Sequence, residues 1–284
     1  MARSPASGRE EIKARLREIG AAPEADIEIA ETALLLAALD RPRVPLGRYR
    51  QHLDDLARET ARAADDDGQA VPLARRLQAL TTVITEGYGY RGDNLTYDDL
   101  QNANLMRVID RRRGLPVAIS ILYIHAARAQ AWQIEGLNFP GHFLLRMETA
   151  GERYIFDPFN SGKVLGTPEL RRLIKSLGGE EAELRPEFTE PIGTGDILLR
   201  LQNNIKQRLI QQNRPKDALG TVESMLLVAP AHAGSWREAG LLHSHLGNLR
   251  AAILAFENVM QLSDNDTLRH QVARQLQQLK SQLN

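Results

Sequence analysis

The chain has 284 residues, which is enough for one large domain or two ordinary ones. It carries 36 basic and 36 acidic residues, so its net charge of zero provides no long-range attraction to nucleic acid or anionic lipid. The absence of cysteine excludes disulfides, thiolate metal sites and a cysteine nucleophile. Because the polar N-terminus lacks a signal-peptide core and the most apolar run, residues 115–124, is too short to cross a bilayer, we expect a cytoplasmic protein.

The first third of the chain predicts helices. Residues 1–8 are expected to form a disordered tail, and the acidic segment 64–68 a solvated loop. Between and after them, apolar residues recur at helical spacing, which predicts core-facing stripes. The three stripes are Ile27, Ala30, Leu34 and Ala37, then Leu46, Tyr49, Leu53 and Leu56, then Leu73, Leu77, Leu80 and Val83.

The centre of the chain changes from helices to a mixture of helices and strands. After a Gly-rich loop we expect a short helix from about Tyr97, capped by Thr96, and a second helix from Pro116 to about Ala129. Alternating apolar runs predict strands over 134–138, 142–147 and 153–157, with a hairpin turn at Ala150-Gly151. A further helix, capped by Thr167, carries an apolar stripe of Leu170, Leu173, Ile174 and Leu177.

The C-terminal third predicts a helical repeat. Residues 178–195 are dominated by Gly, Pro and Glu and read as a linker. The following residues match the tetratricopeptide pattern: Trp236, Ala239, Gly240, Leu246-Gly247-Asn248, Ala252 and Phe256. Ala218 and Pro230 fit a preceding copy of the repeat. In that copy, Gln202 and Lys206 occupy the positions of the early Trp and Gly. A final apolar-striped helix fits the cap that a short array needs.

The predicted fold is therefore α+β. It has a helical N-terminal part, a small α+β core and C-terminal α-helical tetratricopeptide repeats. We expect a tail over 1–8, a domain over 9–177 that includes the helical N-terminal part, a linker over 178–195 and repeats with a capping helix over 196–284.

A histidine and an aspartate stand out in the predicted hairpin. Pairing about the Ala150-Gly151 turn would bring His142 opposite, or nearly opposite, Asp157. A general base and an orienting carboxylate are two of the three groups of a nucleophilic triad. The alternative is a structural hydrogen bond that holds the end of the hairpin together.

Three segments of the centre resemble a known family. They are residues 90–123, which contain RRGLPV, residues 138–146, NFPGHFLLR, and residues 154–162, which contain DPFNSG. Together with the repeats they resemble a bacterial family of transglutaminase-like proteins that is named after a regulator of invasion genes. The resemblance extends from about residue 25 to the C-terminus and implies a papain-like core.

The resemblance also implies roles for individual residues. In the wider transglutaminase-like superfamily a cysteine at a helix N-terminus precedes two strands that carry a histidine and an aspartate. His142 and Asp157 match the last two, whereas the cysteine position falls at or beside Pro116. Ser120 lies one helical turn further on, displaced by about 6 Å, which makes it a weak replacement nucleophile.

Other candidate site residues surround these positions. Asn102 and Asn104 could form a polar wall or donate to an oxyanion, or could be turn and cap residues. Five residues that flank His142 and Asp157 are candidate binding residues: Asn138, Phe139, Pro140, Phe159 and Asn160. No cofactor and no metal site is predicted. The basic run Arg111 to Arg113 is expected to be an ordinary solvated stretch or, less simply, a grip for an anionic partner.

Three functions fit the sequence. The first is a non-catalytic transglutaminase-like adaptor or regulator that binds a protein or peptide through its degenerate cleft and its repeat groove. The second is a hydrolase or acyl transferase of altered mechanism that uses His142 and Asp157 with water or Ser120. The third is a nucleic-acid regulator, which only the family name suggests and which the neutral charge opposes. We expect a protein or peptide partner, with neither nucleic acid nor membrane.

Overall fold

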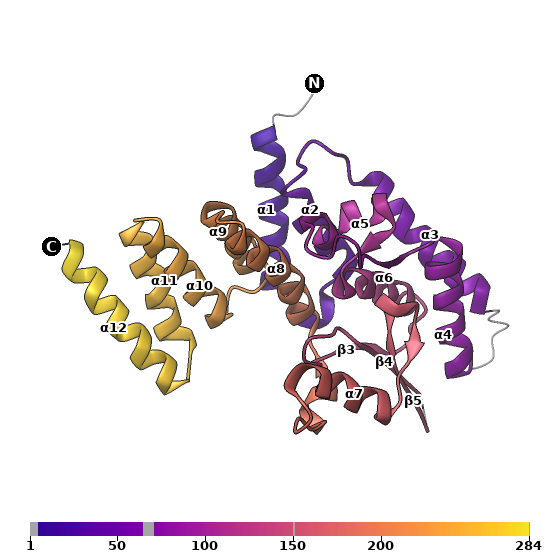
Figure 1. The fold of residues 1–284 in the computed structure, drawn as a ribbon. Coiled ribbons are helices and arrows are strands. Elements are labelled where there is room, and N and C mark those ends of the chain that lie inside the picture. Colours follow the sequence, from indigo (N-terminus) through magenta and orange to yellow (C-terminus); the bar gives the residue numbers. More distant parts are fainter. Residues whose placement is uncertain (1–4, 65–70, 150, 284) are drawn as a thin grey trace. The chain divides into compact units, whose positions relative to one another are not determined.

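The structure is a computed structural model that describes residues 5–64, 71–149 and 151–283, and the chain divides into two compact units (Figure 1). The first unit comprises residues up to Arg9 together with Glu24–Leu198, and the second comprises Glu10–Pro23 together with Leu199–Asn284. This division differs from the predicted domains, because the first unit extends beyond residue 177 and residues 10–23 group with the C-terminal helices. Of the predicted disordered tail, residues 1–4 lie outside the described residues, and residues 5–8 begin a helix, α1 (Pro5–Ala21).

Helices of the first unit bury the predicted apolar stripes. They are α2 (Ile29–Ala38), α3 (Gly47–Ala64) and α4 (Leu73–Thr81), with the short turns η1 (Glu24–Asp26) and η2 (Thr82–Gly87). Every stripe residue is buried except Leu46, which is half-buried and lies just before α3. Most of the predicted loop 64–68 lies outside the described residues, and Ala64 is the last residue of α3.

The central helix of the first unit is α6 (Pro116–Arg128), with the bounds that the sequence predicts to within one residue. Its residues are apolar on every face, and ten of the thirteen are buried, as expected of a helix enclosed by other elements. Pro116 occupies the first turn, where a missing N–H removes no intrahelical hydrogen bond. The described residues contain no helix that is long and apolar enough to span a membrane.

The sheet of the first unit has five strands in the order β6-β5-β4-β3-β7. The strands are β3 (Ile134–Leu137), β4 (Leu145–Thr149), β5 (Glu152–Asp157), β6 (Lys163–Val164) and β7 (Pro191–Ile192), and all neighbours are antiparallel. The helices α4 and α6 pack on one face, and α7 (Thr167–Gly178) lies on the other (Figure 1). Thr149 pairs with Glu152, as the predicted hairpin requires, while Ala150 lies outside the described residues.

Two helix starts differ from the prediction. No helix begins at Tyr97. The turn η3 (Leu100–Ala103) begins after Asp99, and α5 (Leu105–Arg111) begins after Asn104, each capped by that residue's side chain. Thr96 instead donates its N–H and its hydroxyl to the carboxylate of Asp93, so it belongs to the loop. The helix α7 begins at Thr167 with Gly166 as its cap residue, whose N–H donates to the Glu169 carboxylate.

The predicted linker 178–195 is wrong as a description of that segment. It contains the turn η5 (Pro186–Thr189) and the strand β7, which pairs with β3. Ala182, Leu184 and Phe188 also pack against the apolar cluster under α7. The composition of this segment suggests a linker because Gly, Pro and Glu dominate it. Its few apolar residues nevertheless pack against the core, and the Gly and Pro residues form the turns between them. Leu177, predicted to be buried, is 52% exposed.

The second unit contains the repeats that the sequence predicts. The helices are α8 (Thr194–Gln211), α9 (Pro215–Val228), α10 (Ala233–His245), α11 (Leu249–Leu262) and α12 (Asp266–Leu283), and the division between the units falls within α8. Gly240 of α10 lies so close to α11 that a Cβ there would be 2.6 Å from the ring of Phe256. In the weaker first copy, Gln202 and Lys206 are both buried, and Lys206 is held by Asn203 and Glu238.

The sequence did not predict that α1 contributes to the second unit. Leu16 is fully buried, and the backbone of α1 approaches α9 so closely that a Cβ on Gly20 would lie 2.1 Å from the carbonyl oxygen of Leu227. An N-terminal helix that covers the first repeat protects an apolar edge of the array, as α12 does at the other end.

We expect Gly240→Leu to destabilise the second unit by about 2–3 kcal/mol, because the new side chain would overlap the Phe256 ring. Gly220→Leu is the matched control. Gly220 is an exposed helical glycine with no atom within 4 Å of its missing Cβ, so its replacement should stabilise α9 by up to about 1 kcal/mol. Urea unfolding followed by circular dichroism measures both changes. Equal changes in unfolding free energy for the two variants would show that helix propensity, and not close packing against Phe256, determines the effect at Gly240.

Candidate functional site

A buried carboxylate, Asp93, organises the loop between the helical part and α6. It accepts hydrogen bonds from the N–H and the hydroxyl of Thr96 at 2.9 and 2.7 Å. It also forms an ion pair with the Arg111 guanidinium at 2.9 Å. Burial alone would raise the pKa of Asp93, but the bonds from Thr96 and Arg111 outweigh it and lower the pKa to about 2. The short parallel pair of β1 (Arg91–Gly92) and β2 (Arg113–Gly114) lies beside it.

Asn102 and Asn104 are held by structural hydrogen bonds. The amide of Asn102 donates to the Thr96 carbonyl at 2.6 Å and accepts from Arg111 at 2.8 Å, and the side chain is fully buried. Asn104 caps α5 by accepting from the Arg107 N–H, and its amide donates to the Ala37 carbonyl at 3.1 Å. Of the two roles left open by the sequence, these bonds favour the cap and turn role.

The basic run is not a solvated stretch, because each of its three side chains is at least half-buried. Arg111 pairs with Asp93, as above. Arg112 has a left-handed backbone (φ 59°), and its guanidinium lies over the rings of Tyr88 and Tyr90 at 5.4 and 4.8 Å. It also contacts the Nε2 atom of His52 at 2.6 Å. Burial, and then the charge of Arg112, lowers the pKa of His52 to about 4, so this ring is neutral and can accept from the guanidinium.

Asp157 lies at the end of β5, and its buried carboxylate caps the turn η4 (Pro158–Asn160). It accepts from the N–H groups of Phe159 and Asn160 at 2.9 and 3.4 Å and from the Asn160 amide at 2.6 Å. Burial raises the pKa of the nearby Tyr123 to about 12, and the Asp157 charge adds to this effect. Asp157 therefore has a structural role that its residue type alone does not reveal.

His142 lies in the connection between β3 and β4, not in a strand as predicted. The ladder between β4 and β5 pairs Leu145 with Phe156, so it continues to Leu144 opposite Asp157, two residues beyond His142. The strand starts late because the residues from Asn138 form a loop that contains Gly141 at a positive φ of 66°. The half-buried His142 ring lies edge-on to Phe139, with their centroids 6.5 Å apart.

The predicted position of the superfamily cysteine, at or beside Pro116, falls at the first turn of α6. Ser120, one turn further on, is fully buried. Its hydroxyl makes no hydrogen bond within the described part of the chain, so neither His142 nor any other described group is positioned to take its proton. A nucleophile needs both a base and access to substrate, and Ser120 has neither.

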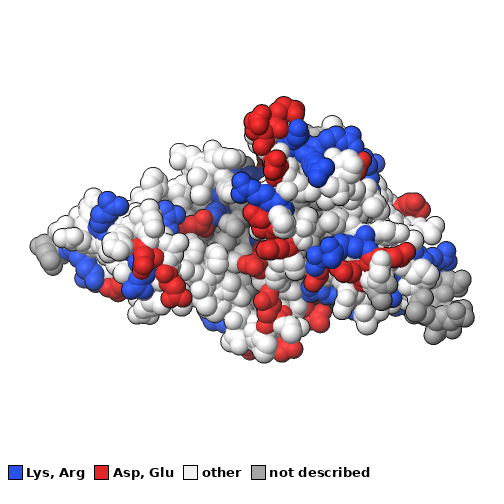
Figure 2. All heavy atoms as spheres, turned by 90° about the horizontal axis from the view of Figure 1, so that it is seen from below, with Lys and Arg blue, Asp and Glu red and all other residues white. Residues whose placement is uncertain are grey.

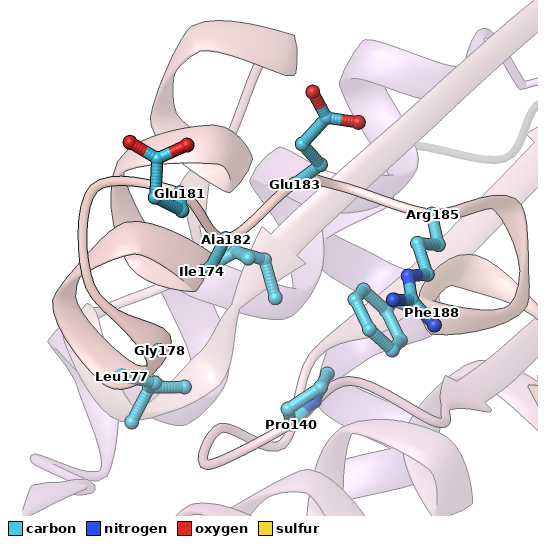
Figure 3. Close-up of a pocket in the computed structure, with 9 residues that line it drawn as sticks. All are labelled: Pro140, Ile174, Leu177, Gly178, Glu181, Ala182, Glu183, Arg185 and Phe188. Carbon is cyan, nitrogen blue, oxygen red and sulfur yellow. The ribbon is translucent and has the colours of Figure 1, made fainter.

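The five candidate binding residues occupy different surroundings. Phe139 is buried in the cluster under α7, and the Phe159 ring packs on Gly92 and lies edge-on to Tyr97. Asn138 and Asn160 are exposed. Pro140 lines a pocket of about 480 Å³, together with residues from α7 and from the segment 181–188 (Figure 3). The sequence reasoning missed this pocket because it treated 178–195 as a linker, although the glutamates of that segment were a visible signal.

The remaining chemistry of the described residues is sparse. They contain no group of three or more His, Asp or Glu side chains arranged to hold a metal ion. Figure 2 shows basic and acidic residues interspersed over the face that it draws.

Comparison with known proteins identifies the family. A model described as the transglutaminase-like superfamily matches residues 47–203, and a tetratricopeptide-repeat model matches residues 205–277. The chain belongs to the transglutaminase-like superfamily. The predicted combination of this domain with C-terminal repeats is confirmed, as is the α+β fold class.

Similar proteins occur in several bacteria. The chain is similar to a UPF0162 protein of Xylella fastidiosa, with 28% identity over 83% of this chain and 84% of that one. A UPF0162 protein of Pseudomonas aeruginosa is 29% identical over 88% of this chain and 90% of its own. The UPF0162 protein YchA of Escherichia coli is 25% identical over 68% and 72%, respectively. The name taken from an invasion-gene regulator remains a prediction.

We expect Asp93→Asn to destabilise the transglutaminase-like unit by about 2–4 kcal/mol, because Arg111 would lose its buried partner. The acid sensitivity should also change. Asp93 has a folded pKa of about 2, below its ordinary value of 3.8, so its contribution is complete above pH 3.8 and is lost as the pH falls toward 2. Between pH 7 and pH 3, the unfolding free energy of the wild type should fall by about 1–2 kcal/mol more than that of Asp93→Asn. Urea unfolding at the two pH values measures this difference. Asp54→Asn, at an exposed position, is the control.

Asp157→Ala should destabilise the same unit by about 1–2 kcal/mol, since the N–H groups of η4 lose their acceptor. Asp157→Asn should cost less than the alanine variant, because an amide oxygen can still accept. Thermal unfolding measures both. A change below the experimental error for Asp157→Ala would contradict the capping role.

Proposed function

We propose that the protein is a non-catalytic member of the transglutaminase-like superfamily that binds a protein or peptide segment. The single observation that carries the proposal is that a proline, which offers no nucleophile, begins α6 at or beside the position that the resemblance assigns to the superfamily's cysteine. The Asp157 carboxylate also accepts three hydrogen bonds from its own turn. The tetratricopeptide unit supports the binding role, because such repeats generally form surfaces for partner segments.

The main alternative is a hydrolase or acyl transferase in which His142 activates water or Ser120. The buried Ser120 hydroxyl, without a hydrogen bond to the described residues, argues against the serine version. The water version has a distinct signature: His142→Ala would abolish turnover, and Asp157→Asn would lower it. A role in direct nucleic-acid binding has less support, since Arg111 and Arg112 are engaged within the protein.

We expect the purified chain to hydrolyse or transfer ester, thioester and amide model substrates no faster than the His142→Ala variant does. The physical reason is that acyl transfer without an activated nucleophile retains nearly the whole uncatalysed barrier. Product release followed by mass spectrometry measures the rates. Turnover above this control, lost in His142→Ala while the unfolding free energy stays unchanged, would overturn the non-catalytic assignment.

The binding role has a direct test of its own. Selection from a random peptide-display library on the immobilised full chain should enrich peptides that bind with dissociation constants between about 1 and 100 µM. Titration of the enriched peptides by fluorescence anisotropy measures the affinities. If repeated selections enrich no peptide above a heat-denatured control, the proposed function is wrong.

A further inference from the structure

The pocket beside the His142 loop has an apolar lining. Ile174 is buried, Phe188 and Ala182 are half-buried, and all three pack in the apolar cluster under α7. Pro140 closes one side, and the 52%-exposed Leu177 stands at another (Figure 3). A volume of about 480 Å³ lies in the ordinary range of ligand pockets.

The rim of this pocket is acidic. Glu181 and Glu183 line it, and Figure 3 shows their carboxylates directed away from the apolar side chains. Residues 180–190 contain five glutamates and one arginine. Arg185 also lines the pocket, and its guanidinium is 3.8 Å from the Glu187 carboxylate. Lys175 is 3.0 Å from Glu180, whereas Glu181 and Glu183 form no ion pair within the described residues. The lining of the apolar hollow therefore carries two exposed glutamates without an ion pair to any described residue and one arginine, which is paired with a third glutamate of the same segment.

The segment that carries these charges is held in place before any partner arrives. The Ala182 N–H donates to the Gly179 carbonyl at 3.0 Å, and the Phe188 N–H donates to the Arg185 carbonyl at 3.1 Å. Further along, the Glu190 carbonyl accepts from the Asn138 N–H at 3.0 Å, next to the pairing of β7 with β3. A preformed wall loses less conformational entropy on binding than a mobile one.

We propose that this pocket, which we call the α7 pocket, receives a basic peptide segment in which an apolar side chain is flanked by Lys or Arg. The apolar side chain enters between Pro140, Leu177 and Phe188, and the flanking cations lie against Glu181 and Glu183. Complementary charge selects this occupant over an acidic or a wholly apolar segment. The inference rests on the proposed binding function and names the place and the chemistry of one partner.

The test uses the full chain and three labelled synthetic peptides. The first has a central Leu-Phe pair with two lysines on each side; in the second glutamates replace the lysines; in the third glycines replace Leu-Phe. We expect fluorescence anisotropy at low salt to show binding of the first peptide only. The double variant Glu181→Lys and Glu183→Lys should weaken this binding by about tenfold. Leu177→Ser should weaken it by about threefold to tenfold, because less apolar surface is buried.

Matched variants control for net charge and folding. Asp54→Lys with Glu152→Lys changes the net charge by the same amount at exposed positions that do not line the pocket, and should leave the affinity unchanged. Val164→Ser removes an exposed apolar side chain from the edge strand β6 and should also have no effect. Circular dichroism melting confirms that each variant folds, which is expected because every substituted residue is exposed.

Each other outcome overturns the proposal. Equal affinity for the lysine and glutamate peptides would show that charge does not select the partner. An unchanged affinity of the Glu181/Glu183 double variant would show that the peptide does not bind at this pocket. If Leu177→Ser instead abolishes a concentration-dependent self-association, the pocket's occupant is a second copy of this chain. Failure of all three peptides, while display-selected peptides still bind the double variant normally, refutes the α7 pocket and leaves the proposed function intact. If neither the synthetic peptides nor display-selected peptides bind the chain, both the α7 pocket and the proposed binding function are refuted.

Discussion

The buried ion pair between Asp93 and Arg111 is the interaction on which the rest of the transglutaminase-like unit depends. It joins the Gly-rich loop to the end of α5, and Arg111 at the same time binds the amide of Asn102. The Asn102 carbonyl then accepts the Leu115 N–H at 2.8 Å, directly before α6 begins. One carboxylate therefore positions, through a short chain of hydrogen bonds, the helix start that gives this superfamily its nucleophile position. Removal of one partner leaves a buried charge, which is why such pairs tolerate little change.

This framework explains why so many residues of the family motif are engaged in hydrogen bonds within the unit. Asp93, Asn102 and Arg111 form one bonded group, and Asp157 and Asn160 form a second at the turn η4. Both groups satisfy buried backbone N–H and C=O groups that would otherwise cost stability. A hydrogen-bonded scaffold of this kind contributes to stability whether or not a nucleophile lies beside it. Retained motif residues are thus weak support for retained catalysis, and the surfaces around them are better guides to function.

Those surfaces are of two kinds. The repeat unit offers the regular surface of a helical array, closed at one end by α12 and covered at the other by part of α1. The transglutaminase-like unit offers the irregular α7 pocket, in which five apolar residues, two glutamates and one arginine meet because a Glu-rich segment folds back on α7. If the proposed binding function holds, two dissimilar surfaces could engage two segments of one partner, and linkage would then raise the overall affinity above that of either surface.

The sequence by itself determined the helices and their buried stripes, the repeats and the hairpin, because each follows from a local period. The stripe of Leu73, Leu77 and Leu80 and the start of α6 at Pro116 are examples. It also determined that no cysteine nucleophile exists. Helix caps were less predictable: Thr96 was an acceptable cap by type, but a buried carboxylate three residues away took its hydroxyl.

Only the tertiary structure decided how the site is arranged. His142 was expected opposite Asp157, yet a positive-φ glycine delays the strand, and a register error of two residues is invisible to an alternating pattern with a period of two. The role of residues 178–195 depended on contacts with α7 and β3, which lie far away in sequence. The grouping of α1 with the repeats likewise rests on the close approach of Gly20 to Leu227, more than two hundred residues later. Local periodicity specifies elements, whereas partners distant in sequence are fixed only by packing.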